Sequence, residues 1–261
     1  MTEEEKEEKK ENENNSEEIS VIEQTPLPIK AEELKEIVPE VIKLEEVSEI
    51  DRWIPKTILG KAVMEGKVTS MDEVLESGKK IMEPEISDKL LPGLKNELVL
   101  IGGRAGKGGG IQRIPVRITA KMHQSGRRFR TSSFVIVGNE NGFVGIGKGS
   151  SIEARTAISK SLKKAKLNII KVKRGCGSWE CGCGTEHTIP FKTKGKSGSV
   201  KVELIPAPKG VGLVANDEAK KLFRLAGIKD IWMKSRGHTS NRINFIYAIF
   251  DALKKLYVYE R

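Results

Sequence analysis

The chain has 261 residues, of which 46 are Lys or Arg and 36 are Asp or Glu, so its formal net charge is +10. Residues 1–50 hold 17 acidic and six basic side chains, which leaves a net charge of +21 on residues 51–261. This surplus indicates a polyanionic partner, most commonly nucleic acid, and it argues against an ordinary metabolic enzyme and against the balanced charges of a thermophile surface.

The N-terminal end of the chain predicts a disordered acidic tail over residues 1–30. Its first 20 residues are almost entirely polar, so they do not form a signal peptide. No apolar run in the chain approaches the roughly 18 residues that a membrane-spanning helix needs. The sequence therefore predicts a cytosolic protein with no membrane partner.

An extended or helical arm is expected next, over residues 31–93. It opens with helical spacing that Pro39 interrupts, so any helix there is short. Further along, Thr69 or Ser70 is expected to cap a helix that Gly78 ends. The arm is therefore predicted to become ordered toward its C-terminal end.

A glycine loop and three strands are expected after the arm. Residues 102–110 (GGRAGKGGG) favour a flexible basic loop. Alternating apolar and polar residues then predict strands, and the sequence GNENG favours a hairpin turn between the last two. The three strand patterns cover residues 111–123, 127–138 and 143–147.

Three helices and one more strand are expected in the second half of the chain. The first helix covers residues 150–169, with Ser150 or Ser151 as its cap and lysines opposite its apolar stripe. Asn216 is expected to cap the second helix, and Gly227 to end it. The later strand and the two later helices cover residues 198–208, 216–228 and 241–257.

Residues 142–151 (GFVGIGKGSS) match G-x-x-x-x-G-K, the start of the phosphate-binding loop of nucleotide hydrolases. That motif needs Ser or Thr after Lys148 to hold Mg²⁺, and here the position is Gly149. The stretch also follows an antiparallel hairpin, whereas the motif follows a strand of a parallel sheet. The dinucleotide fingerprint G-x-G-x-x-G fails as well, because Ser150 takes its last position. The glycines are expected either to let the backbone approach RNA phosphates or to permit a tight turn from strand to helix.

Two long segments resemble the universal small-subunit ribosomal protein five family. They are residues 134–172, which contain FVIVGNENGFVGIGKGSS, and residues 202–253, which contain VELIPAPKGVGLVANDEAKKLFR. The resemblance runs from about residue 94 to residue 256, so it begins shortly before the glycine loop. Residues 53–74 (WIPKTILGKAVMEGKVTSMDEV) resemble the archaeal and eukaryotic branch, and the lack of a long eukaryotic tail favours an archaeon.

The resemblance implies an α+β fold with two domains. The first, over residues 94–173, is similar to a double-stranded-RNA-binding domain, in which one helix packs on a three-stranded antiparallel sheet. The second is a smaller βαβα domain over residues 189–261. A cysteine-rich junction over residues 174–188 separates the two.

The resemblance also implies a structural constituent of the small ribosomal subunit in the cytoplasm. Such a protein binds small-subunit rRNA near the central pseudoknot, beside the path by which mRNA enters. Its neighbours are small-subunit proteins four and eight, and it supports assembly and decoding accuracy in translation. No catalytic residue and no small-molecule substrate are implied. The alternative is a free-standing double-stranded-RNA-binding regulator, which leaves the second domain and the arm unexplained.

Candidate binding residues follow from matching segments of the family. The basic turn KMHQSGRRFR matches an RNA-contacting loop, GKGSS matches the loop before the first helix, and GVGLVANDEAKKLFR matches the face toward protein four. Three further cations are added from charge alone. The candidate RNA-binding residues are Arg104, Lys107, Arg113, Lys121, Gly126, Arg127, Arg128, Arg130 and Lys148, and the candidate protein-interface residues are Gly210, Lys220 and Arg224. RNA affinity is expected to fall steeply with salt, because the cations would release counterions from the phosphates.

The cysteine-rich junction predicts a zinc site. Three thiols and one imidazole are a complete tetrahedral ligand set for structural zinc, although the spacing C-x4-C-x-C-x3-H is not a standard one. The candidate ligands are Cys176, Cys181, Cys183 and His187. Family members without the cysteines have a similar HTIP segment, so the imidazole could serve RNA contact or packing instead. Free thiols and a redox switch stay open as alternatives, while a disulfide framework is disfavoured by the odd, local cluster.

Overall fold

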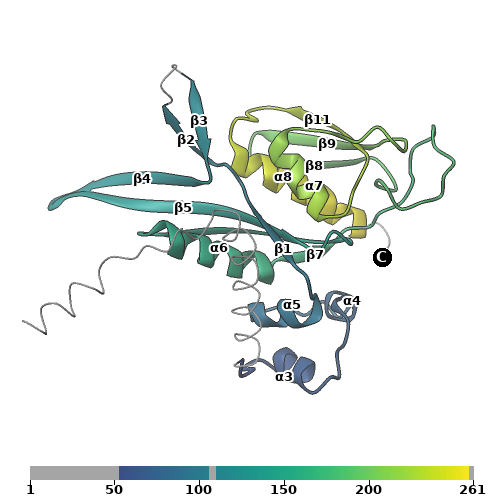
Figure 1. Cartoon of the computed structure of the whole chain (residues 1–261), viewed down its shortest axis with the longest axis horizontal. Helices are drawn as coiled ribbons and strands as arrows, with labels where there is room; N and C mark the ends of the chain where they lie inside the picture. Colours follow the sequence, from purple (N-terminus) through teal and green to yellow (C-terminus); the bar gives the residue numbers. More distant parts are fainter. Residues whose placement is uncertain (1–52, 106–109, 259–261) are drawn as a thin grey trace, which may run out of the picture. The chain divides into compact units, whose positions relative to one another are not determined.

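The structure, a computed structural model, describes residues 53–105 and 110–258 (Figure 1). The expected tail, the first part of the expected arm and the candidate RNA-binding residue Lys107 lie outside the described residues. None of the described helices is both long enough and apolar enough to cross a membrane.

The described part of the arm contains three short helices, α3 (Ile58–Met64), α4 (Met71–Glu76) and α5 (Pro84–Leu90). Ser70 caps α4 by accepting a backbone hydrogen bond in its first turn, and Gly78 follows the helix with a φ of 68°, so this prediction is confirmed. The apolar cluster of the arm includes Ile169, and the Ser87 hydroxyl donates to the Lys166 carbonyl at 2.7 Å. These contacts hold the arm against the sheet and helix that follow it in the chain.

Five antiparallel strands form the first sheet, and the helix α6 (Ala154–Leu167) packs against it. β4, β5, β6 and α6 are the three-stranded sheet and helix that the resemblance implies. β4 pairs with the first half of β5 and β1 with its second half, while β7 pairs with β6 and forms an edge of the sheet. The strands are β1 (Lys95–Leu98), β4 (Val116–His123), β5 (Gly126–Gly138), β6 (Phe143–Ser151) and β7 (Ile169–Lys171).

A separate two-stranded hairpin precedes β4. Its strands are β2 (Gly102–Ala105) and β3 (Ile111–Ile114), so the expected loop over residues 102–110 is wrong for the first four of them. The single strand expected over residues 111–123 is divided at Pro115. Proline has no N–H to donate to a ladder, and the chain leaves one sheet and enters the other at this residue.

The start of α6 also differs from the expectation. Ser150 and Ser151 do not cap this helix, because they still belong to β6 and pair with Ser132 and Thr131 of β5. Glu153 is the N-cap residue, and its side chain makes no capping hydrogen bond. The β5–β6 ladder therefore continues through the two serines, and the helix begins after them.

The second sheet has the strand order β10-β11-β9-β8, with β10 and β11 parallel and the other pairs antiparallel. Asn216 caps α7 through a hydrogen bond from the Glu218 N–H, and Gly227 follows it with a φ of 77°, so both predictions are confirmed. Residues 172–192 connect the two sheets, and the predicted domain boundaries remain predictions. The elements are β8 (Thr193–Ser197), β9 (Val200–Pro206), β10 (Leu213–Val214), α7 (Asp217–Leu225), β11 (Ile231–Arg236) and α8 (Arg242–Val258).

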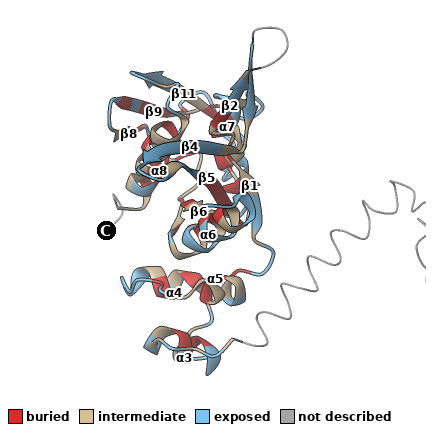
Figure 2. Ribbon diagram, turned by 90° about the vertical axis from the view of Figure 1, so that its left-hand side faces the viewer, coloured by how far each residue is buried: buried red, intermediate tan, exposed pale blue. Residues whose placement is uncertain are grey.

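The two sheets share one apolar core. The C-terminal half of β5 is buried on both faces: Val135 packs with residues of α6, and Phe134 belongs to the cluster that includes α7 and α8. The rings of Phe134 and Tyr247 meet edge to face at 5.4 Å. The Glu140 N–H, in the β5–β6 turn, donates to the Leu225 carbonyl at the end of α7. Figure 2 shows the buried residues gathered where these elements meet.

One buried carboxylate joins the segment after β1 to the second half of the chain. Glu218 is 2% exposed and accepts hydrogen bonds from the Leu100 N–H at 3.2 Å and from Arg242 at 2.8 Å. Arg242 also donates to the Leu100 carbonyl at 2.8 Å. Because both oxygens of this buried carboxylate have hydrogen-bond donors, the charge is compensated, and the network holds the segment after β1 against α7 and α8.

Candidate nucleic-acid interface and metal centre

The three glycines that precede and follow Lys148 lie in the middle of β6 and beneath α6. A Cβ on Gly145, Gly147 or Gly149 would overlap backbone atoms of Ala165, Ser161 and Ala157, respectively. The glycines are two residues apart in the strand, which is about 6.6 Å, and their partners are four residues apart in the helix, which is about 6 Å. Because the two spacings nearly match, successive glycines meet successive turns of the helix. The glycines therefore serve close packing of helix on strand.

This arrangement corrects both interpretations of the G-x-x-x-x-G-K stretch. The glycines form neither a phosphate loop nor a tight turn, because β6 continues through Ser151 and α6 begins only at Ala154. Lys148 is an exposed residue within β6, opposite Phe134, and it lies six positions before the helix. The architecture of a nucleotide hydrolase is absent at this stretch, while Lys148 as an RNA-binding residue stays a prediction.

The β4–β5 hairpin carries most of the predicted RNA-binding cations. Lys121 lies opposite Arg128, and Arg130 is two residues further along β5, so these three side chains share one face of the ladder. All three are exposed, and within the described residues none has a carboxylate in ion-pair distance. Arg127 lies on the other face of the hairpin, and Gly126 adopts a φ of 113° in the turn. The structure thus brings three of the candidates together without a neutralising partner.

The remaining RNA-binding candidates are distributed over other strands. Lys148 is on the same face of the first sheet as Arg128 and Arg130, as the β5–β6 register shows. Arg104 and Arg113 lie on the separate β2–β3 hairpin and are exposed. Sequence reasoning missed Arg117, an exposed residue on the same face of β4 as Lys121, although the two-residue spacing of residues 117, 119 and 121 indicates it.

The candidate protein-interface residues do not form one cluster by any described contact. Lys220 and Arg224 are four residues apart on α7, and therefore lie on one face of the helix. Lys220 pairs with Asp217 at 3.5 Å, and Arg224 is exposed. Gly210 lies in the loop before β10 with a φ of 95°. All three remain predicted interface residues.

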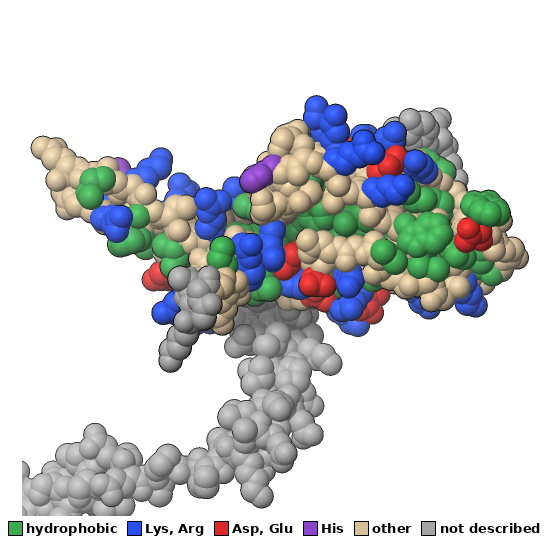
Figure 3. Space-filling model, turned by 90° about the horizontal axis from the view of Figure 1, so that it is seen from above, with side chains coloured by type: hydrophobic (Ala, Val, Ile, Leu, Met, Phe, Trp, Pro, Cys, Tyr) green, Lys and Arg blue, Asp and Glu red, His purple; other side chains and the backbone are tan. Residues whose placement is uncertain are grey.

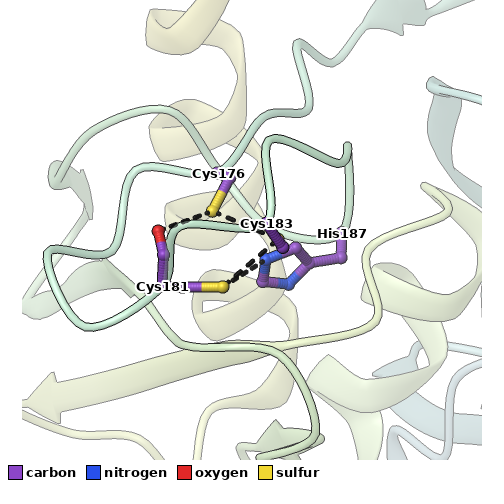
Figure 4. A group of neighbouring side chains, drawn as sticks. All are labelled: Cys176, Cys181, Cys183 and His187. Carbon is purple, nitrogen blue, oxygen red and sulfur yellow. Dashed lines mark hydrogen bonds between the residues drawn. The ribbon is translucent and has the colours of Figure 1, made fainter.

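The cysteine-rich junction folds its four candidate ligands around one point (Figure 4). The Sγ atoms of Cys181 and Cys183 are 3.2 Å apart, those of Cys183 and Cys176 are 3.6 Å apart, and His187 Nε2 lies 3.7 Å from the Cys181 Sγ. All four atoms lie within 4.8 Å of one another. Ligands bound tetrahedrally to zinc at about 2.3 Å are separated by about 3.8 Å, so the cluster has the size of a zinc site.

A second carboxylate orients the imidazole toward the thiols. His187 Nδ1 lies 2.8 Å from the Asp230 Oδ2, and the two side chains are 5% and 7% exposed. The other oxygen of Asp230 accepts hydrogen bonds from the Gly210 and Gly212 N–H groups at 3.1 and 2.8 Å. An Asp on the far nitrogen of a histidine is the usual outer partner of a metal ligand. Sequence reasoning missed Asp230, which lies 43 residues from His187 with no motif connecting them.

The thiols differ in their protonation. Hydrogen bonds from the Thr185 hydroxyl and backbone lower the pKa of the Cys183 thiol to about 6. Partial burial raises the pKa of the Cys176 thiol above its ordinary value. The Cys183 thiol therefore ionises more readily than the Cys176 thiol, and the thiolate is the form in which cysteine binds metal.

Comparison with known proteins assigns the family. Residues 112–173 match the family described as ribosomal protein S5, N-terminal domain, and residues 195–261 match ribosomal protein S5, C-terminal domain. Three archaeal relatives carry the name small ribosomal subunit protein uS5. The relative from Methanocaldococcus jannaschii is 51% identical to this chain, and the match covers 79% of this chain and 88% of the relative. The relative from Nanoarchaeum equitans is 52% identical, with 79% of this chain and 89% of the relative covered. The relative from Thermofilum pendens is 50% identical, with 78% of this chain and 94% of the relative covered. The chain therefore belongs to the ribosomal protein S5 family.

Proposed function

We propose that this chain is a structural constituent of the small ribosomal subunit, in the cytoplasm, and that it holds small-subunit rRNA with the β4–β5 hairpin. The S5 family consists of structural ribosomal proteins and not of enzymes. The observation that carries the RNA contact is the row of unpaired cations, Lys121, Arg128 and Arg130, on one face of an exposed hairpin. Such side chains neutralise phosphates, and they suit the recognition of folded RNA by shape.

The finer placement in the subunit follows from the family resemblance. We infer contact with rRNA near the central pseudoknot, beside the path of incoming mRNA, and contact with small-subunit proteins four and eight. Lys220 and Arg224 on α7, together with Gly210, form the inferred surface toward protein four. Through this surface the protein would affect decoding accuracy, and through the RNA contacts it would support assembly.

Removal of the hairpin cations is expected to weaken rRNA binding. Log affinity falls as log salt concentration rises, and in the variant Lys121→Gln/Arg128→Gln/Arg130→Gln the magnitude of this slope is expected to decrease by about 2 to 3. The reason is that each lost phosphate contact removes about one unit of slope. Equilibrium binding of the full chain to transcribed small-subunit rRNA at several salt concentrations measures this slope. The control variant Lys61→Gln/Lys79→Gln/Lys80→Gln removes the same charge from exposed positions of the arm. Equal slopes for the two variants would contradict the proposed hairpin contact.

Sedimentation separates the proposal from the alternative of a free-standing RNA-binding regulator. A constituent of the subunit stays with small subunits through a high-salt wash, whereas a regulator leaves them. The contact of α8 with the first sheet, through Tyr247 and Phe134, favours the constituent, because both family domains then act as one body.

We further propose that Cys176, Cys181, Cys183 and His187 hold one structural zinc ion. The ligand types, the separations of their atoms and the orientation of the imidazole by Asp230 support it. The ion would fix the segment between the two sheets, in which the described backbone forms no strand and pairs through an isolated bridge between Gly175 and Thr188 and a few further hydrogen bonds.

A further inference from the structure

The outer face of the second sheet carries cations in register across three strands. The inner face points to α8: a Cβ on Gly195 would overlap backbone atoms of α8, and Val200, Val202 and Leu204 are buried. Alternate residues therefore face outward. The β8–β9 and β9–β11 registers place Lys194, Glu203 and Lys234 in one row, and Lys196, Lys201 and Arg236 in the next.

The second of these rows has no anion in it. Lys196, Lys201 and Arg236 are all exposed, and within the described residues no carboxylate lies in ion-pair distance of any of them. The first row contains a single acid, Glu203, which pairs with Lys192 at 2.8 Å and Lys194 at 3.5 Å. Figure 3 shows Lys and Arg side chains gathered on the side of the molecule where β9 and β11 lie.

A row of like charges lowers the stability of the sheet that carries it. Cross-strand neighbours on one face have Cβ atoms about 4.5–5.5 Å apart, and like charges in these positions are destabilising. Here the repulsion acts twice, between Lys196 and Lys201 and between Lys201 and Arg236. A bound polyanion would remove this repulsion.

We propose that this outer face, centred on Lys201, is a second RNA-binding surface that holds a stretch of rRNA phosphate backbone. The inference rests on the proposed function and extends it to the second half of the chain. Charge complementarity selects the occupant: an exposed sheet face with five cationic side chains and one carboxylate in its two rows fits a regularly charged backbone. Trp232 is partly exposed in the row next to Lys234 and extends the face with an aromatic surface.

The charge reversal Lys201→Glu separates binding from folding. It replaces the central cation by a carboxylate between Lys196 and Arg236, so the melting temperature is expected to stay the same or to rise. Its affinity for transcribed small-subunit rRNA is expected to fall at least about ten-fold at moderate salt, because phosphate contacts are lost. The variant Lys196→Gln/Lys201→Gln/Arg236→Gln is expected to lower the salt slope by about 2 to 3.

The arm variant Lys61→Gln/Lys79→Gln/Lys80→Gln is the matched control for loss of charge. The variant Lys121→Gln/Arg128→Gln/Arg130→Gln, here called the hairpin variant, is the reference for weakened rRNA binding. Sheet-face variants that bind rRNA like the arm control, while the hairpin variant binds more weakly, would overturn this inference and leave the proposed function intact. A parent protein without salt-dependent rRNA binding would instead overturn the proposed function. Unchanged rRNA affinity together with reduced incorporation into subunits would assign the face to an acidic protein and would also overturn the inference.

Discussion

Purified without chelator, the protein is expected to contain about one zinc ion per chain, and the variant Cys181→Ser is expected to contain none. The Cys181 sulfur contacts both Cys183 and the His187 imidazole, so its loss opens the cluster at its centre. Zinc present at a thousandfold excess over its Kd stabilises the fold by about 4 kcal/mol. The melting temperature of the variant is therefore expected to be roughly 8–16 °C lower. Metal analysis and thermal unfolding of the two proteins measure both effects.

Two further variants test the geometry of the proposed zinc site. Asp230→Asn keeps all four ligands but weakens the support of His187, and its zinc affinity is expected to be about 10- to 100-fold lower. Trp179→Ala changes a side chain in the same segment that is 91% exposed, and it is expected to keep the metal. A parent protein without zinc, or a Cys181→Ser variant with an unchanged melting temperature, would contradict the zinc proposal and favour the alternative that the three cysteines are free thiols.

Gly147→Ala is expected to be the most damaging small substitution in the first sheet. The added Cβ would overlap the Ser161 carbonyl and the Ala165 backbone, and neither can move without lifting α6 from β6. Overpacking of this kind costs about 3 kcal/mol or more when backbone must shift. The expected fall in melting temperature is roughly 6–12 °C.

Gly110→Ala is the matched control for this substitution, because nothing lies within 4 Å of its added Cβ. Lys148→Ala, at the neighbouring exposed position, is likewise expected to leave the melting temperature unchanged. Equal stability of the Gly147→Ala variant and the parent would contradict the role assigned to the three glycines. Circular dichroism melting of the four proteins is sufficient for the comparison.

The elements that could be predicted from the sequence are those whose signal is local. Ser70 and Asn216 cap their helices as expected, because a capping side chain bonds its own first turn. Ser150 and Ser151 have the same chemistry but do not cap α6, since their pairing with β5 depends on the long hairpin. Short elements such as β2 and β8 carry too few apolar residues to be recognised by pattern alone.

The candidate sites also divide into residues with a local sequence signal and residues that only the tertiary structure brings together. The four proposed zinc ligands lie within twelve positions, and their residue types alone indicated them. Asp230 is brought to His187 by the turn before β11, which no local pattern predicts. The glycines of β6 correctly indicated a close approach to the backbone, but the predicted partner was wrong: it is α6 and not a phosphate. Sequence alone does not separate the two, because both need a residue without a side chain.

The shared core has a consequence for the modularity of the protein. Two separate family descriptions cover the two halves of the chain, yet β5 buries one face against α6 and the other against α7 and α8. Either half expressed alone would present a bare apolar surface around Phe134 or Tyr247. The two halves are therefore expected to unfold together as one cooperative unit. A chimera that takes one half from a relative must also take the residues of the other half that contact it across β5.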